Sequence, residues 1–194
     1  MNRAAFVVGV SILGASASFG AVIHLSSERV AGVQMERPGV TPINIEVEAD
    51  FSENEFHGFA EATLPVGNGT ATVRSWHDSV IGSDSIDVRL RHELTQTDFR
   101  PDVATVGYAF PYINFAFELP ESAQANFILS GGGYGPQGFM NTYVSFFPGT
   151  LQEPGDSPRF HLNEWTGGPF FGESTMYVPA GRYTLLFWID AGDD

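Results

Sequence analysis

Alternation of apolar and polar residues is the dominant pattern of this chain. It is strict from Ile43 to Phe51 and recurs over residues 86–94 and 113–118. A period of two places successive side chains on opposite faces, which predicts half-buried β-strands. No sustained helical period follows residue 30. Clusters of β-branched and aromatic residues between turn residues predict further strands at 70–76, 103–110, 124–130, 141–147, 159–162 and 174–178.

Turn sequences rich in glycine and proline separate these segments at intervals of roughly 8 to 12 residues. They include Gly67-Asn68-Gly69, Gly82-Ser83-Asp84 and Leu119-Pro120-Glu121. Many short strands at this spacing, without a repeat of fixed period, are typical of an all-β domain. We therefore expect a single antiparallel β-sandwich, jelly-roll or immunoglobulin-like, over residues 21–194.

The C-terminal segment predicts a β-hairpin and a central strand. Residues 175–178 lead through Pro179-Ala180-Gly181 into residues 182–189. Proline fixes one turn dihedral and glycine accepts a positive one. Because Leu185–Ile189 is apolar at every position, the last strand is expected to be covered on both faces or capped by a loop.

The first residues have the layout of a secretory signal helix. Arg3 is followed by an uncharged run, and small residues stand at Ala15 and Ala17, the two positions that a signal peptidase recognises. We expect residues 1–17 to be removed. The alternative is a later cleavage point, up to residue 20. A second alternative is a membrane anchor over residues 4–23, but its second half is mostly Ala, Ser and Gly. The expected destination is the extracellular space, the cell surface or the periplasm, with no stable membrane insertion after cleavage.

Composition and charge narrow the class of partner. The 194 residues contain no cysteine, and their formal net charge is −14. All nine basic residues are arginine. Nucleic acid is therefore an unexpected partner, because phosphate binding needs a positive surface. Without cysteine the exported domain has no disulfides, so its stability must come from its hydrophobic core.

The segment Val178–Leu185 has the form apolar-x-Ala-Gly-x-Tyr-x-Leu. It resembles the C-terminal segment of uncharacterised secreted bacterial β-sandwich proteins of jelly-roll type, which often carry a sorting anchor with a Pro-Glu-Pro motif. No apolar stretch or basic tail of that anchor follows Asp194, so free secretion is expected. Because no catalytic motif is present, we expect a non-enzymatic protein with a structural or interaction role, with glycans or other extracellular proteins as partners.

The aromatic residues of region 131–172 suggest a carbohydrate-binding site. Exposed aromatic rings stack on the apolar faces of sugars, while Asn and Glu side chains bond sugar hydroxyl groups. The alternative is that these rings cover the ends of the hydrophobic core. The candidate ligand-binding residues are Tyr134, Asn163, Glu164, Trp165 and Phe170.

Acidic residues suggest two further kinds of site. Glu46, Glu48 and Asp50 share one strand face, which favours a carboxylate-dependent glycoside hydrolase or, as the alternative, a solvated strand face. The C-terminal residues Asp190, Asp193 and Asp194 are candidate ligands for a structural calcium ion, with a plain acidic terminus as the alternative. No other cofactor is expected. The five histidines lack metal-ligand spacing and are expected to be isolated surface or turn residues.

Overall fold

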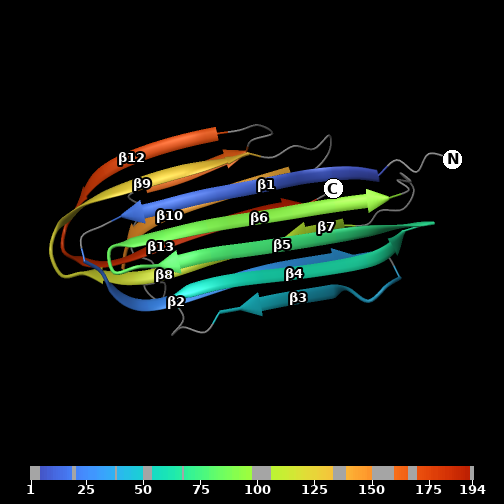
Figure 1. The fold of residues 1–194 in the computed structure, drawn as a ribbon, viewed down its shortest axis with the longest axis horizontal. Helices are drawn as coiled ribbons and strands as arrows, with labels where there is room; N and C mark the ends of the chain where they lie inside the picture. Colours follow the sequence, from blue (N-terminus) through green and yellow to red (C-terminus); the bar gives the residue numbers. More distant parts are fainter. Residues whose placement is uncertain are drawn as a thin grey trace.

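A computed structural model of the chain confirms the predicted all-β antiparallel sandwich. In the described residues, thirteen strands form two sheets that lie one in front of the other in Figure 1. No helix in this part of the chain has the length and apolarity needed to cross a membrane. The described residues are 5–18, 21–37, 39–49, 54–66, 68–97, 106–132, 139–149, 160–165 and 170–192.

Sheet A is the front layer of Figure 1 and combines strands from both ends of the chain. In spatial order the sheet contains β12 (Phe170–Val178), β9 (Ala123–Gly132), β1 (Ala5–Ser18), β6 (Ser85–Thr97), β5 (Gly69–Ile81) and β4 (Glu55–Val66). The consecutive strands β4, β5 and β6 pair as an antiparallel meander, and the chain reverses between them where the sequence predicted turns.

Sheet B lies behind sheet A. In spatial order it contains β11 (Phe160–Trp165), β10 (Phe139–Pro148), β13 (Gly181–Gly192), β7 (Val106–Ala109), β2 (Ile23–Glu36) and β3 (Ile43–Glu48). Strand β8 (Tyr112–Leu119) pairs with β13 and β2, the same neighbours as β7. The two short strands therefore follow one another between the same partners, and they are interrupted at Phe110 and Pro111. Proline has no N–H group for the ladder, which explains the break.

The space between the sheets contains two apolar clusters separated by a polar zone. On the inner face of β5, Val73 belongs to one cluster and Ile81 to the other. The buried residues between them on the same face are Ser75, His77 and Ser79. The Nδ1 atom of His77 lies 3.0 Å from the backbone oxygen of Val30 in β2, so this side chain links the two sheets. Buried histidine here replaces the apolar residue that the alternating pattern would favour.

The predicted C-terminal hairpin is wrong, because its two strands belong to different sheets. Strand β12 pairs with β9 in sheet A, whereas β13 pairs with β10, β8 and β7 in sheet B. The Pro179-Ala180-Gly181 segment therefore crosses from one sheet to the other. Gly181 has the positive φ that the sequence suggested, 151°. The Tyr183 hydroxyl donates a hydrogen bond to the Pro179 oxygen at 2.8 Å, which fixes the crossing from the sheet B side.

The segment with the layout of a secretory signal forms β1 in this structure. It pairs with β6 along its whole length and with β9 over residues 12–18, so it is an internal strand of sheet A. Removal of residues 1–17 stays a prediction. Such removal would take an internal strand out of sheet A.

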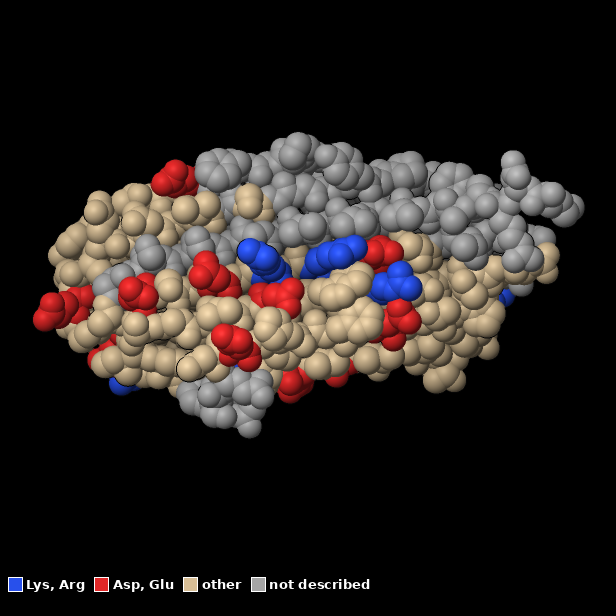
Figure 2. All heavy atoms as spheres, viewed as in Figure 1, with Lys and Arg blue, Asp and Glu red and all other residues tan. Residues whose placement is uncertain are grey.

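Several charged side chains on the outer face of sheet A form ion pairs. Figure 2 shows this face, with arginine side chains lying among acidic ones over β4, β5 and β6. Arg74 lies between two glutamates: its Nε atom is 2.5 Å from Glu61 Oε2, and its Nη1 atom is 3.0 Å from Glu93 Oε1. The Arg91 guanidinium lies 4.4 Å from the centre of the Trp76 ring and 3.1 Å from a Glu93 oxygen. Exposed pairs of this kind add little stability, but they offset the charges of Glu61 and Glu93.

Candidate functional site

The outer face of sheet B carries a row of residues that crosses the strands. Ile113 and Leu185 are buried in the core, so the residues beside them in sequence point to the opposite, outer face. Residues that stand directly opposite each other in antiparallel strands share a face. From β3 to β11, the row consists of Glu48, Val30, Tyr112, Trp188, Tyr143 and Asn163.

A shallow pocket opens at the middle of this row. It has a volume of about 320 Å³ and is lined by Phe110, Tyr112, Leu186 and Trp188. Trp188 keeps 36 % of its surface exposed, although its strand is internal in the sheet. The apolar run over residues 185–189 therefore belongs to a central strand, as predicted, but its outer face is open enough for an aromatic ring to reach solvent. The volume is at the lower end of the range for small-molecule sites.

Phe110 reaches the pocket because of the interruption between β7 and β8. Its backbone N–H donates to the Gly32 oxygen at 2.9 Å. A Cβ atom at Gly32 would overlap the Phe110 ring, so glycine in β2 makes room for that ring. The absence of a side chain at this buried position thus shapes one wall of the pocket.

The Gly32→Ala substitution is expected to push the Phe110 ring out of its place and to deform the pocket. Because the ring can move into solvent, we expect a modest loss of stability, about 1 kcal/mol, together with weaker binding of any pocket ligand. Chemical denaturation and a binding titration on the same variant measure the two effects. Unchanged binding in the variant would show that the Phe110 wall is not part of the site.

Carboxylates border the pocket on the β2–β3 side. The Tyr112 hydroxyl donates a hydrogen bond to Glu28 Oε1 at 2.6 Å. Burial raises the pKa of Tyr112, and the hydrogen bond to Glu28 together with the negative charges of Glu28, Glu46 and Glu48 raises it further. Tyr112 is therefore a neutral hydrogen-bond donor at physiological pH. Glu28, Glu46 and Glu48 are themselves exposed to solvent.

The backbone register brings two of the sequence-predicted ligand residues to this face. Asn163 stands opposite Tyr143, which in turn stands opposite Trp188. Trp165 and Asp190 both stand opposite Asn141, in the next row of the same face. The predicted sugar-binding residues of β11 therefore belong to a strand two places from β13, which carries Trp188.

The other sequence-predicted ligand residues are not brought to the pocket. Glu164 stands opposite Thr142, whose other partner is Ile189, so it belongs to the opposite face of sheet B. Phe170 begins β12 in sheet A and stands opposite Gly131. Tyr134 lies outside the described residues.

The structure does not test the predicted calcium site. Asp190 is part of β13, whereas Asp193 and Asp194 lie outside the described residues. The described part of the chain contains no group of three or more His, Asp or Glu residues placed to hold a metal ion.

The carboxylate row proposed for catalysis lies on an edge strand. Glu46 and Glu48 share the outer face of β3, opposite Gly32 and Val30, and the third member, Asp50, is outside the described residues. A glycosidase needs one carboxyl group that burial keeps protonated as an acid. The exposure of Glu46 and Glu48 favours the alternative of a solvated strand face.

Two histidines depart from the expected surface positions. Burial lowers the pKa of both His77 and His92 to about 4, so both are neutral at physiological pH. His57 is exposed as expected, and a 2.7 Å hydrogen bond to Asp78 raises its pKa. The buried pair belongs to the polar zone of the core, away from the outer face of sheet B.

Sequence reasoning missed five residues of this site: Glu28, Phe110, Tyr112, Leu186 and Trp188. The position of Trp188 inside an apolar run hid it, because such a run predicts burial on both faces. The outward position of Trp188 could have been found from the period of two. Leu185 and Phe187 supply the core face of the strand, so Trp188, next to Phe187, belongs to the other face. Comparison of the chain with protein-family models, with curated proteins and with solved structures gave no match.

Proposed function

We propose that this chain is a non-catalytic binding protein that holds a glycan chain on the outer face of sheet B. The observation that carries the proposal is the pocket formed by Trp188 and Tyr112 beside exposed carboxylates. An aromatic ring that is open to solvent, next to hydrogen-bonding groups, offers the two contacts that a sugar ring needs. Its apolar face stacks on the aromatic ring, and its hydroxyl groups bond the polar neighbours.

The direction of the row favours a chain-like ligand over a single small molecule. Neighbouring strands are about 4.8 Å apart, so a row that crosses the sheet places one side-chain position at each such step. On the β3 side of the pocket, Glu46 and Glu48 are exposed, whereas Val30 between Tyr112 and Glu48 is buried. We propose that one sugar unit stacks at Trp188 and that neighbouring units of the chain reach the exposed carboxylates of β3.

Export is part of the proposal and rests on the sequence. The order of a basic residue, an apolar run and small residues over positions 1–17 supports secretion, and glycans outside the cell are then the available partners. Another extracellular protein is the alternative partner for the same face. A glycoside hydrolase is the alternative activity, and it predicts release of reducing sugar that is lost in Glu46→Gln or Glu48→Gln.

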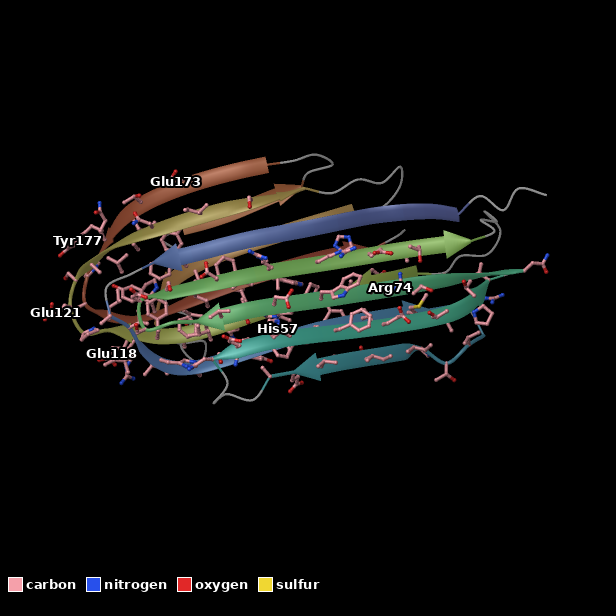
Figure 3. All side chains as sticks on the ribbon, viewed as in Figure 1. His57, Arg74, Glu118, Glu121, Glu173 and Tyr177 are labelled. Atoms are coloured by element: carbon pink, nitrogen blue, oxygen red, sulfur yellow. The ribbon has the colours of Figure 1, made fainter. Side chains whose placement is uncertain are left out.

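The Trp188→Ala substitution is expected to weaken glycan binding about 30-fold, because a central aromatic contact at a binding site is worth roughly 2 kcal/mol. The measurement is a titration of oligosaccharides by calorimetry or by intrinsic fluorescence. Tyr177→Ala is the matched control: Tyr177 is 69 % exposed but projects from β12 of sheet A, far from the pocket (Figure 3). Equal loss in both variants, or no binding by the unaltered protein, would contradict the proposed site.

A further inference from the structure

We infer that the glycan bound on the outer face of sheet B is a polymer of amino sugars whose amino groups are protonated. The inference rests on the proposed function and adds the charge of the ligand. It comes from the unequal distribution of charged side chains between the two outer faces of the sandwich.

The two outer faces differ in how their acidic residues are compensated. On sheet A, Arg74 and Arg91 pair with Glu61 and Glu93. On sheet B, the described outer-face side chains include a single cation, Arg182, and it already pairs with Glu118 at 3.2 Å. The acids around the pocket are thus left without a basic residue on their own face.

The uncompensated acids lie on the β2–β3 side of the place where a sugar would stack. Glu28 touches Tyr112, and Glu48 belongs to the same cross-strand row as Tyr112 and Trp188. Glu46 stands opposite Gly32, whose missing side chain makes room for the Phe110 wall of the pocket. All three carboxylates are exposed, so a ligand in solvent can reach them.

Protonated amino sugars match this arrangement in two ways. Their ammonium groups can form charge-assisted hydrogen bonds with Glu28, Glu46 and Glu48. Trp188, which is partly exposed beside these acids, offers a further cation–π attraction to such a group. Glycans with carboxylate or sulfate groups meet the opposite situation, since like charges at a binding face are repelled.

Three oligosaccharides with one backbone separate this inference from the proposed function. They are the β-1,4-linked hexamers of glucose, N-acetylglucosamine and glucosamine, which differ in the group at carbon 2. We expect the glucosamine hexamer to bind at least tenfold more tightly than the other two, and its binding to weaken as salt is added. The two uncharged hexamers should bind alike and show little dependence on salt.

The double substitution Glu46→Gln and Glu48→Gln tests the assigned residues. It is expected to weaken binding of the glucosamine hexamer roughly fivefold, because each exposed charge contact contributes little, and to leave the other hexamers unaffected. Glu173→Gln is the control, since Glu173 is an exposed acid on β12 of sheet A (Figure 3). Equal binding of all three hexamers would overturn the charge inference and leave the glycan site standing. If none of them binds, the proposed function and the inference both fail.

Discussion

A chain that starts at residue 19 is expected to lose the cooperative fold of the full-length protein. Strand β1 lies between β6 and β9, so its removal divides sheet A into two parts. The ladder hydrogen bonds on both sides of β1 are lost, and each hydrogen bond of this kind contributes about 0.5–1.5 kcal/mol. The whole stability of a domain is only about 5–15 kcal/mol, so the loss of both ladders is enough to unfold it.

The register also places β1 beside strands of the hydrophobic core. Its residues Ala15 and Ala17 stand opposite Val88 and Ile86, two buried core residues of β6. Removal of β1 therefore opens the sheet at strands that contribute to the core.

Thermal and chemical unfolding of the shortened chain measures this effect, with a chain lacking residues 2–4 as the control, because that deletion ends before β1. The shortened chain should show no cooperative transition, or a melting temperature lower by tens of degrees. Equal melting temperatures for the full-length and the shortened chain would show that β1 is dispensable.

This prediction also constrains secretion. Cleavage after Ala17 would remove β1 except for Ser18. An exported protein with the fold described here must therefore keep the segment, or fill the position between β6 and β9 with another strand. The intact mass of the protein recovered outside the cell distinguishes cleavage from retention of the segment.

Acidification from pH 6.5 to pH 4 is expected to destabilise the protein by several kcal/mol through two buried histidines. Burial lowers the pKa of His77 and His92 to about 4, and the nearby charge of Arg29 lowers that of His77 further. In the unfolded chain both groups titrate near 6.5. Between these values the unfolded chain binds more protons, so stability falls as the pH falls, by roughly 3 kcal/mol per histidine at pH 4.

The His92→Leu substitution isolates this effect. His92 Nδ1 has no hydrogen-bond partner among the described residues, so an apolar residue of similar size should preserve stability at pH 7.5. Measured by denaturation across this pH range, the variant should lose about half of the pH dependence assigned to the two histidines. A pH dependence identical to that of the unaltered protein would contradict the assignment.

His57→Gln is the control with the opposite sign. His57 is exposed, and its hydrogen bond to Asp78 raises its pKa. A group whose pKa is raised in the folded state adds stability at low pH and loses it as the pH rises through that pKa. Removing it should therefore make the loss of stability on acidification slightly larger, whereas His92→Leu makes it smaller.

The periodic pattern predicted strands more reliably than it predicted their burial. The strictest alternation became β3, which lies at the edge of its sheet and is largely exposed, and in β8 the outward residues Asn114 and Ala116 are buried along with Ile113, Phe115 and Phe117. In β6 the apolar positions likewise face the core. The pattern did not identify β4, although every second residue of that strand is buried. Its inward positions include Gly58, Ala60 and Ala62, which differ little in hydrophobicity from their neighbours.

The pairing of strands was beyond the reach of local patterns. The segment around Pro179 has the composition of a hairpin turn, yet β12 and β13 belong to different sheets. Turn residues specify a change of direction, but the choice between returning to the same sheet and crossing to the other depends on which free edge is available. The available edges of β9, β10 and β8 are formed by distant parts of the chain, which no local window contains.

The sequence by itself determined the all-β class, the alternating faces of the most amphipathic strands and the acidic, disulfide-free character of the protein. These properties depend on residue type and on a period of two along one segment. Tertiary structure alone decided that Trp188 and Tyr112 meet in one pocket, that Phe110 fills the space left by Gly32, and that exposed glutamates border them. Such a site depends on the order and register of five or more strands, and these are set by the packing of the whole chain.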